Sequence, residues 1–205
     1  MLAAPFLSRH AVDQIVKLTP LVAGALSAAV IAGITVWTFA HLPGLWVWAA
    51  FIGWASYDHS GATRKALFTS SACSVFGVVM AWLVALVVAG SVIPIASSIS
   101  SAVAAAIASF IIVCVSRYLP FSNVPATFYG FASAFAFLLL SPRALSMEAM
   151  TATDLRNVLI CVPVSLLIGS VLGVVHQTFA SLLTAPEQRS LAPLATRLTP
   201  LKKDS

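Results

Sequence analysis

The sequence predicts an all-α membrane protein with six transmembrane helices, arranged as two inverted three-helix repeats. The chain has 205 residues, of which 60% are hydrophobic and only 8% are charged, whereas a soluble domain carries about 25% charged residues. Its mean hydropathy is +1.00, and its apolar residues form long runs, so lipid is the expected solvent for most of it. One short pattern also occurs twice, once in each half of the chain.

The six predicted spans follow from the length of helix that crosses a bilayer, about 20 apolar residues. They cover residues 18–40, 44–57, 66–89, 92–115, 121–140 and 156–180. The second span is short, and a stretch of about 14 residues can be re-entrant instead. The predicted repeat halves are 18–90 and 91–180. Residues 1–17 are expected to form a cytoplasmic N-terminal segment, and residues 181–205 a flexible cytoplasmic tail.

The distribution of basic residues predicts the orientation. With a cytoplasmic N-terminus and six spans, the cytoplasmic side holds nine of them: Arg9, Lys17, Arg64, Lys65, Arg117, Arg189, Arg197, Lys202 and Lys203. The outer side holds Arg143 and Arg156, in a loop that also contains Glu148 and Asp154. The positive-inside rule therefore places both termini in the cytoplasm. The net charge of +5 is scattered rather than clustered, so nucleic acid is not an expected partner.

The repeated pattern reads AAFIGWAS at residues 49–56 and ATFYGFAS at residues 126–133, each a few residues after a Leu-Pro pair. Two small residues four positions apart, Ala49 and Gly53 or Ala126 and Gly130, share one helix face, which is the spacing that lets helices approach closely. Ser56 and Ser133 follow on the same face. These faces either pack against other helices or line a solute path, and the sequence leaves both alternatives open.

The positions of the two copies favour a transporter architecture. They lie in spans two and five, the middle members of the two halves, and a three-span unit repeated in tandem must be inverted. Inverted repeats are common in transporters, where short or Gly/Pro-interrupted spans point to the solute site. The predicted path residues are Gly53, Ser56, Asn123, Gly130 and Ser133, with constrictions at Phe51, Phe128 and Trp54.

Few other residues could carry chemistry. Asp58 and His59 could relay protons or form a gate, since histidine titrates near neutral pH; alternatively, they belong to a solvated helix end terminated by Gly61. Cys73, Cys114 and Cys161 are isolated within apolar runs, so neither a metal site nor a disulfide is expected. No catalytic or phosphate-binding motif is present, so we expect no cofactor and no enzymatic activity.

Three stretches carry a resemblance to a known family: WVWAAFIGWASYDHSGATRKALFTSSACSVFGVVMAWL, VPATFYGFASAFAF and VPVSLLIGSVLGVV. They resemble a bacterial inner-membrane family catalogued as domain of unknown function 1097, over roughly residues 20–180. This chain departs from the family's more neutral, Gly-rich turn by having Asp58, His59 and Ser60, and its ends are longer. The family has no agreed function, so the resemblance implies a location in the bacterial inner membrane and a fold, but no activity.

The leading functional prediction is a channel or facilitative transporter for a small, neutral or weakly ionised solute, because buried charge is scarce. Six short spans enclose little volume, so a homo-oligomer is expected. The alternative is a non-transporting scaffold or accessory subunit, and a third, weaker one is a membrane enzyme using Asp58 and His59. A polar lumen flanked by both copies would favour transport, whereas copies closed by tight helix contact would favour the accessory role.

Overall fold

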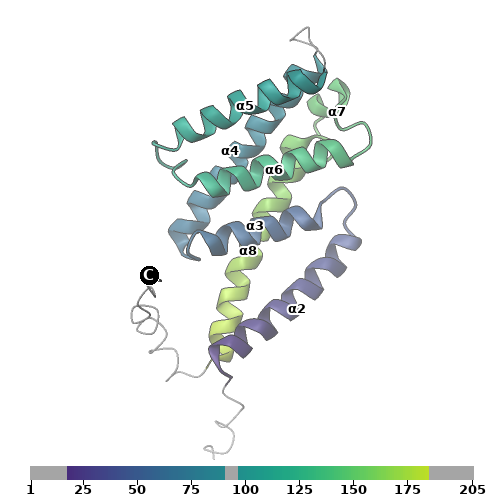
Figure 1. Cartoon of the computed structure of the whole chain (residues 1–205). Helices are drawn as coiled ribbons and strands as arrows, with labels where there is room; N and C mark the ends of the chain where they lie inside the picture. Colours follow the sequence, from purple (N-terminus) through teal and green to yellow (C-terminus); the bar gives the residue numbers. More distant parts are fainter. Residues whose placement is uncertain (1–17, 91–96, 185–205) are drawn as a thin grey trace, which may run out of the picture. The chain divides into compact units, whose positions relative to one another are not determined.

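The structure is a computed structural model that describes residues 18–90 and 97–184. Its described part is all-helical, apart from an isolated bridge between Leu18 and Thr184. Seven helices lie within these described residues (Figure 1): α2 (Pro20–Ala40), α3 (Val47–His59), α4 (Arg64–Ala89), α5 (Ser97–Val115), α6 (Val124–Leu140), α7 (Met147–Thr151) and α8 (Val158–Leu183). The predicted N-terminal segment, and the predicted tail from residue 185 onward, lie outside the described residues.

Four of the described helices are long and apolar enough to cross a membrane, namely α2, α4, α5 and α8. The predicted all-helical class is confirmed for the described residues, and these four helices are candidate membrane spans by their length and composition. The two helices that carry the repeated pattern are shorter, with 13 residues in α3 and 17 in α6. At 1.5 Å per residue these helices extend about 20 and 26 Å, less than the hydrocarbon thickness of about 30 Å.

The chain divides into two compact units, one built from the first part of α2 and the end of α8, and the other from residues 33–175. In the first unit, Ser27 is fully buried. Its hydroxyl donates a hydrogen bond of 3.0 Å to the carbonyl oxygen of His176 and lies 3.1 Å from Nδ1 of the same histidine. This polar contact joins the two helices inside the first unit.

Helix α4 is the centre of the second unit, where it contacts α3, α5, α6 and α7 (Figure 1). One core cluster joins α4, α6 and α8 through buried residues that include Val78, Phe137 and Leu166. A second cluster joins α4 to α5. Most residues of the repeated pattern are buried or half-buried, whereas Ala55 and Ala132 are exposed.

The helix ends follow local sequence signals. Asn123 caps α6, as its side chain accepts a hydrogen bond from the backbone N–H of Ala126, a role that asparagine commonly has at the start of a helix. Thr63 caps α4 in the same way, through Ala66. Helix α3 ends at His59 and is followed by Gly61 with a φ of 98°. Such an angle is readily adopted by glycine, so Gly61 acts as the predicted terminator.

Candidate functional site

The glycine of the first copy lies where α3 crosses α8. A Cβ at Gly53 would overlap the backbone carbonyl of Leu166, and a Cβ at Gly169 would overlap the carbonyl of Ala50. Ser170 adds a hydrogen bond of 3.3 Å from its hydroxyl to the carbonyl of Gly53. The two helices therefore touch at backbone level, which only residues without a side chain allow.

The glycine of the second copy lies where α6 crosses α4, in the same arrangement. A Cβ at Gly130 would overlap the carbonyl of Ser74, and a Cβ at Gly77 would overlap the carbonyl of Thr127. The Ser74 hydroxyl donates a hydrogen bond of 3.1 Å to the carbonyl of Ala126. Gly53 and Gly130 thus face helix backbone, as the packing alternative requires, and do not face a polar path.

The serines of the two copies are both buried but differ in their partners. The hydroxyl of Ser56 lies 3.4 Å from that of Ser74. Ser133 is fully buried, and its hydroxyl, like that of Ser70, has no hydrogen-bond partner among the described residues. Burying a hydroxyl without a partner costs about 1–3 kcal/mol. The Ser133 hydroxyl therefore remains able to form a hydrogen bond with a bound molecule.

The aromatic residues predicted to form constrictions pack within the unit. Trp54 is buried, and its ring stacks on that of Phe51 with centroids 6.2 Å apart. Phe128 packs against the core cluster between α4 and α5. Neither of the two hollows described below is lined by any of these three side chains.

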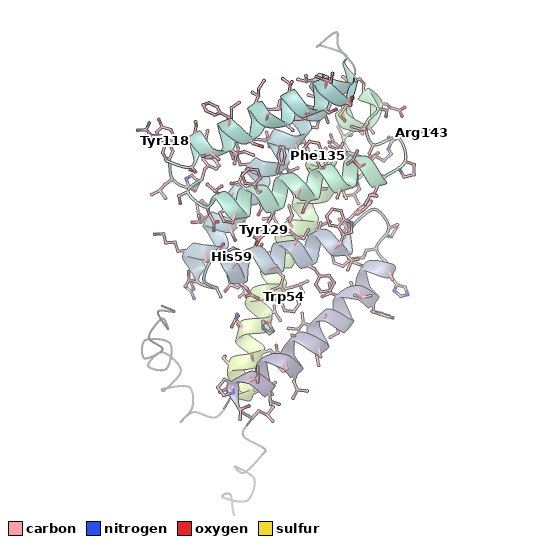
Figure 2. All side chains as sticks on the ribbon, viewed as in Figure 1. Trp54, His59, Tyr118, Tyr129, Phe135 and Arg143 are labelled. Carbon is pink, nitrogen blue, oxygen red and sulfur yellow. The ribbon has the colours of Figure 1, made fainter. Side chains whose placement is uncertain are left out.

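Two hydrogen bonds connect the C-terminal end of α3 with the N-terminal part of α6. One is made by a residue of α6, and the other by Asn123, which caps α6. Nδ1 of His59 lies 2.9 Å from the hydroxyl of Tyr129, and Figure 2 shows these two side chains between neighbouring helices. The side-chain amide of Asn123 donates a hydrogen bond of 2.8 Å to the hydroxyl of Ser60. That hydroxyl donates in turn to the carbonyl of Ser56, at 2.6 Å. His59 is therefore paired with the opposite helix, a partner that its neighbourhood in sequence does not reveal.

The same pair of helices meets through aromatic rings at the start of α3. The rings of Trp46 and Phe137 have centroids 5.3 Å apart and are inclined by 62°, an edge-to-face contact. Such contacts are favoured by the quadrupoles of the rings. The seam between α3 and α6, meaning the line of contacts between these two helices and their capping residues, is thus polar at one end and aromatic at the other.

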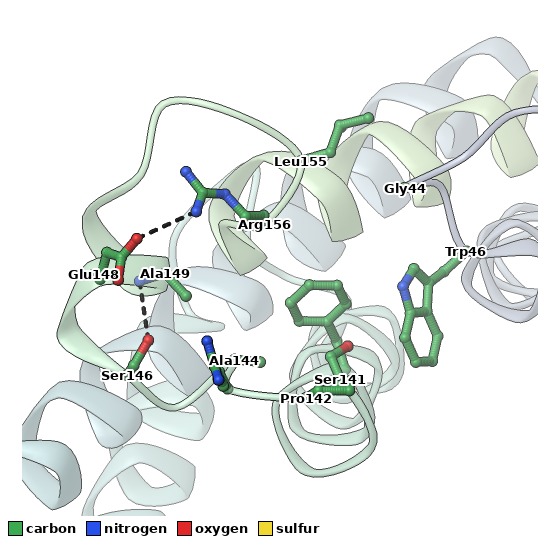
Figure 3. Close-up of a pocket in the computed structure, with 12 residues that line it drawn as sticks. Gly44, Trp46, Ser141, Pro142, Ala144, Ser146, Glu148, Ala149, Leu155 and Arg156 are labelled. Carbon is green, nitrogen blue, oxygen red and sulfur yellow. Dashed lines mark hydrogen bonds and ion pairs between the residues drawn. The ribbon is translucent and has the colours of Figure 1, made fainter.

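Each end of this seam opens into a hollow. A cavity of about 440 Å³ lies at the polar end, lined by Ser60, Thr63, Lys65, Ala66, Thr69, Ser122, Asn123 and Pro125. A cavity of about 350 Å³ lies at the aromatic end (Figure 3), lined by Gly44, Trp46, Phe137, Leu155 and residues of the segment 141–156. Because α6 begins at the first cavity and ends at the second, the two hollows lie at opposite ends of the seam.

Charged side chains border the cavity at the aromatic end. Arg156 forms ion pairs with Glu148 at 3.3 Å and with Asp154 at 3.0 Å (Figure 3 shows the first). The pKa of Asp154 is lowered by the hydrogen bond that its carboxylate accepts from the backbone N–H of Arg156, and by the guanidinium of the same residue. The pKa of Arg156 is raised for the reciprocal reason. Both groups are therefore charged at neutral pH in this loop.

Buried positions of α2 and α3 recur 77 positions later, in α5 and α6. The buried residues of α2 at positions 23, 27, 31 and 35 are each followed 77 positions later by a buried residue of α5, at 100, 104, 108 and 112. In α3, positions 49, 50, 53, 56 and 57 have buried counterparts in α6 at 126, 127, 130, 133 and 134.

Helices α4 and α8 repeat the correspondence at an interval of 92. Positions 66, 70, 73, 74, 77, 78 and 81 of α4 match the buried positions 158, 162, 165, 166, 169, 170 and 173 of α8. The interval grows from 77 to 92 between α6 and α8, where α7 and its flanking loops lie.

Four residues of the seam were not among the predicted site residues: Trp46, Ser60, Tyr129 and Phe137. Ser60 and Phe137 lie just outside the repeated pattern, yet they are 77 positions apart, as are Trp46 and Asn123. Extending the pattern by a few residues at this interval would have pointed to these four positions. Nothing in the sequence pairs His59 with Tyr129.

The chain was compared with protein families, curated proteins and solved structures. No curated protein and no solved structure matches it. The family described as "Protein of unknown function (DUF1097)" matches residues 25–181, which is well over half of the chain. This match agrees with the resemblance carried by the stretches around the two repeated patterns. The protein belongs to the DUF1097 family.

Proposed function

We propose that the protein consists of two inverted three-helix repeats, the first formed by α2, α3 and α4 and the second by α5, α6 and α8. The burial intervals of 77 and 92 residues support this, because each helix of the first half shares many of its buried positions with its counterpart in the second. On this proposal α7 is an insertion in the second half. All six helices cross the membrane, the short α3 and α6 included.

The directions of the helices in the second unit support inversion. Helix α3 runs alongside α8 in the same direction, because Trp46 bonds to Ser165 at one end and Tyr57 approaches Gly173 at the other. Helix α3 runs opposite to α6, since α6 begins near the end of α3. The corresponding helices α3 and α6 thus run in opposite directions, as a two-fold axis in the membrane plane requires.

On this architecture, we propose a channel or facilitative transporter for a small, neutral or weakly ionised solute in the bacterial inner membrane. The observation that carries the proposal is the pair of hollows at opposite ends of the seam between α3 and α6. Transporters with inverted repeats bind their solute at the repeat interface. Ser133 of α6 has a buried hydroxyl with no hydrogen-bond partner among the described residues, and this hydroxyl supplies a group to which a solute could bond.

Swelling of proteoliposomes in a panel of small neutral solutes tests transport. We expect light scattering to show faster swelling than in empty liposomes for some solutes only. Equal rates for every solute in the panel would contradict facilitated transport. Chemical cross-linking in the same membranes would check the predicted homo-oligomer.

A single substitution sharpens this test. Ser133→Ala removes a hydroxyl that has no partner, so the free energy of unfolding should stay the same or rise by about 1 kcal/mol, while solute flux falls. The matched control is Ser70→Ala, which removes another buried hydroxyl that has no partner among the described residues and should leave flux unchanged. An equal effect of both variants on flux would remove Ser133 from the path.

The six-span arrangement makes a separate topological prediction. Ser122, which lines the cavity at the polar end, and Leu145, in the loop after α6, should face opposite sides of the membrane. Cysteines at these positions should react with an impermeant maleimide from the cytoplasmic side for Ser122→Cys and from the outer side for Leu145→Cys. Labelling of both from one side would contradict a membrane-crossing α6.

A second candidate function, a non-transporting scaffold or accessory subunit, is favoured by one observation. The glycine faces of both copies are closed by tight helix contact, at Leu166 and at Ser74. A subunit of this kind needs no solute path. Absence of solute-dependent swelling, together with co-purification of a stoichiometric membrane partner, would favour it over transport.

A further inference from the structure

Helices α3 and α6 are each held at backbone level by a different partner. Gly53 of α3 contacts α8, and Gly130 of α6 contacts α4; a Cβ added at either glycine would overlap a carbonyl group of the partner helix. Between α3 and α6 themselves, the contacts at the two ends of the seam are made by side chains. Side-chain contacts can separate and re-form without repacking a backbone crossing, so the seam is the part of this unit suited to opening.

The contacts at the two ends occupy equivalent positions of the two repeats. Phe137 is 77 positions after Ser60, and Asn123 is 77 positions after Trp46. Exchanging the repeats therefore converts the hydrogen bond between Asn123 and Ser60 into the ring contact between Trp46 and Phe137. Equivalent positions of the two repeats thus hold a polar pair at one end of the seam and an aromatic pair at the other.

Each of these pairs lines the hollow at its own end. Ser60 and Asn123 belong to the wall of the 440 Å³ cavity, and Trp46 and Phe137 to the wall of the 350 Å³ cavity. The polar end has a second bond across the seam, between His59 and Tyr129. Water that enters the cavity can replace either hydrogen bond, whereas separating the two rings exposes apolar surface.

We propose that the seam between α3 and α6 is a two-ended gate, closed at one end by the Asn123–Ser60 latch and at the other by the Trp46–Phe137 ring contact, with the polar latch opening more readily. This inference rests on the proposed transport function and identifies its gating residues. It assigns Asn123 to the latch and gives His59 a supporting role there. Opening of the latch uncovers Ser56, which lies one helical turn deeper on α3 and whose backbone carbonyl accepts the hydrogen bond from the Ser60 hydroxyl.

The rate at which a thiol at position 56 reacts tests the gate without reference to any solute. Ser56→Cys is introduced into a background with Cys73→Ser, Cys114→Ala and Cys161→Ser, where serine keeps the hydrogen-bond donors to Pro120 and Gly44. The membranes are treated with a small water-soluble methanethiosulfonate from the side of Lys65. Ser60→Ala breaks the latch but leaves the Asn123 cap of α6 intact, and Asn123→Ser breaks it while keeping a capping hydroxyl.

Both latch variants should increase the modification rate by about three- to tenfold, the change in open population that follows from losing one hydrogen bond. Trp46→Leu loosens the other end and serves as the matched control, with no acceleration from this side. If the latch variants are as stable to heat as the parent Ser56→Cys protein and their thiol is modified at the same rate, the proposed gate is overturned. Solute flux in the same proteoliposomes is measured separately. If the latch variants accelerate thiol modification but no solute flux is detected, the gate stands and the transport function is overturned. If flux is detected but the modification rate is the same in all variants, transport stands and the gate is overturned.

Discussion

Replacing Gly77 or Gly130 by alanine should prevent α4 and α6 from packing. Each added Cβ would lie within bonding range of a backbone carbonyl, of Thr127 or of Ser74, so the helices would have to separate. Overpacking in a close-packed core typically costs about 1–3 kcal/mol, and a clash with backbone belongs at or above the upper end of that range. Thermal denaturation in detergent should show a large loss of stability or no folded protein.

Gly24→Ala and Gly33→Ala are the matched controls. Both glycines lie within α2, and a Cβ at either position would meet no atom within 4 Å. Alanine favours a helix over glycine by about 1 kcal/mol, so these variants should be as stable as the wild type or more stable. A loss of stability at Gly24 or Gly33 as large as that at Gly77 would show that helix crossing is not what requires glycine.

Met150→Ala should strongly destabilise the segment between α6 and α8. Met150 is 1% exposed and belongs to the core cluster, and its carbonyl accepts a hydrogen bond of 3.1 Å from the indole of Trp82. Truncating a buried methionine costs about 2–5 kcal/mol, depending on how far the cavity collapses. Limited proteolysis should therefore cut residues 141–157 much faster in the variant.

Met147→Ala provides the control within the same short helix. The side chain of Met147 is 49% exposed, so its truncation should change the free energy of unfolding by less than about 0.5 kcal/mol. Equal proteolysis of the two variants would mean that Met150 does not anchor α7 to the core. The cavity at the aromatic end shares this segment, so its shape should change only in Met150→Ala.

The membrane class and the helices could be derived from composition and the lengths of apolar runs. Lipid satisfies no backbone hydrogen bond, so an apolar run of this length has few alternatives to a helix. The cap at Asn123 and the terminator at Gly61 are local effects, and they too were evident from neighbouring residues. The two copies of the glycine pattern and their small-residue spacing were likewise evident from the sequence.

The meaning of that pattern depended on what lies across from each helix. A glycine four residues from an alanine fits a helix crossing and a solute path equally well in sequence, and only the positions of the Leu166 and Ser74 carbonyls distinguish them. The seam contacts between His59 and Tyr129 and between Trp46 and Phe137 join residues 70 and 91 positions apart. Such pairs have no local signal, because nothing near either residue specifies its partner.

The sequence by itself determined that this is a helical membrane protein of the DUF1097 family with a glycine pattern in each half, because apolar length and small-residue spacing are properties of single segments. Only the tertiary structure decided that α3 packs on α8 and α6 on α4, and that the seam between α3 and α6 is polar at one end and aromatic at the other. The physical reason is that packing partners are chosen by the complementarity of two distant surfaces, which no single segment encodes.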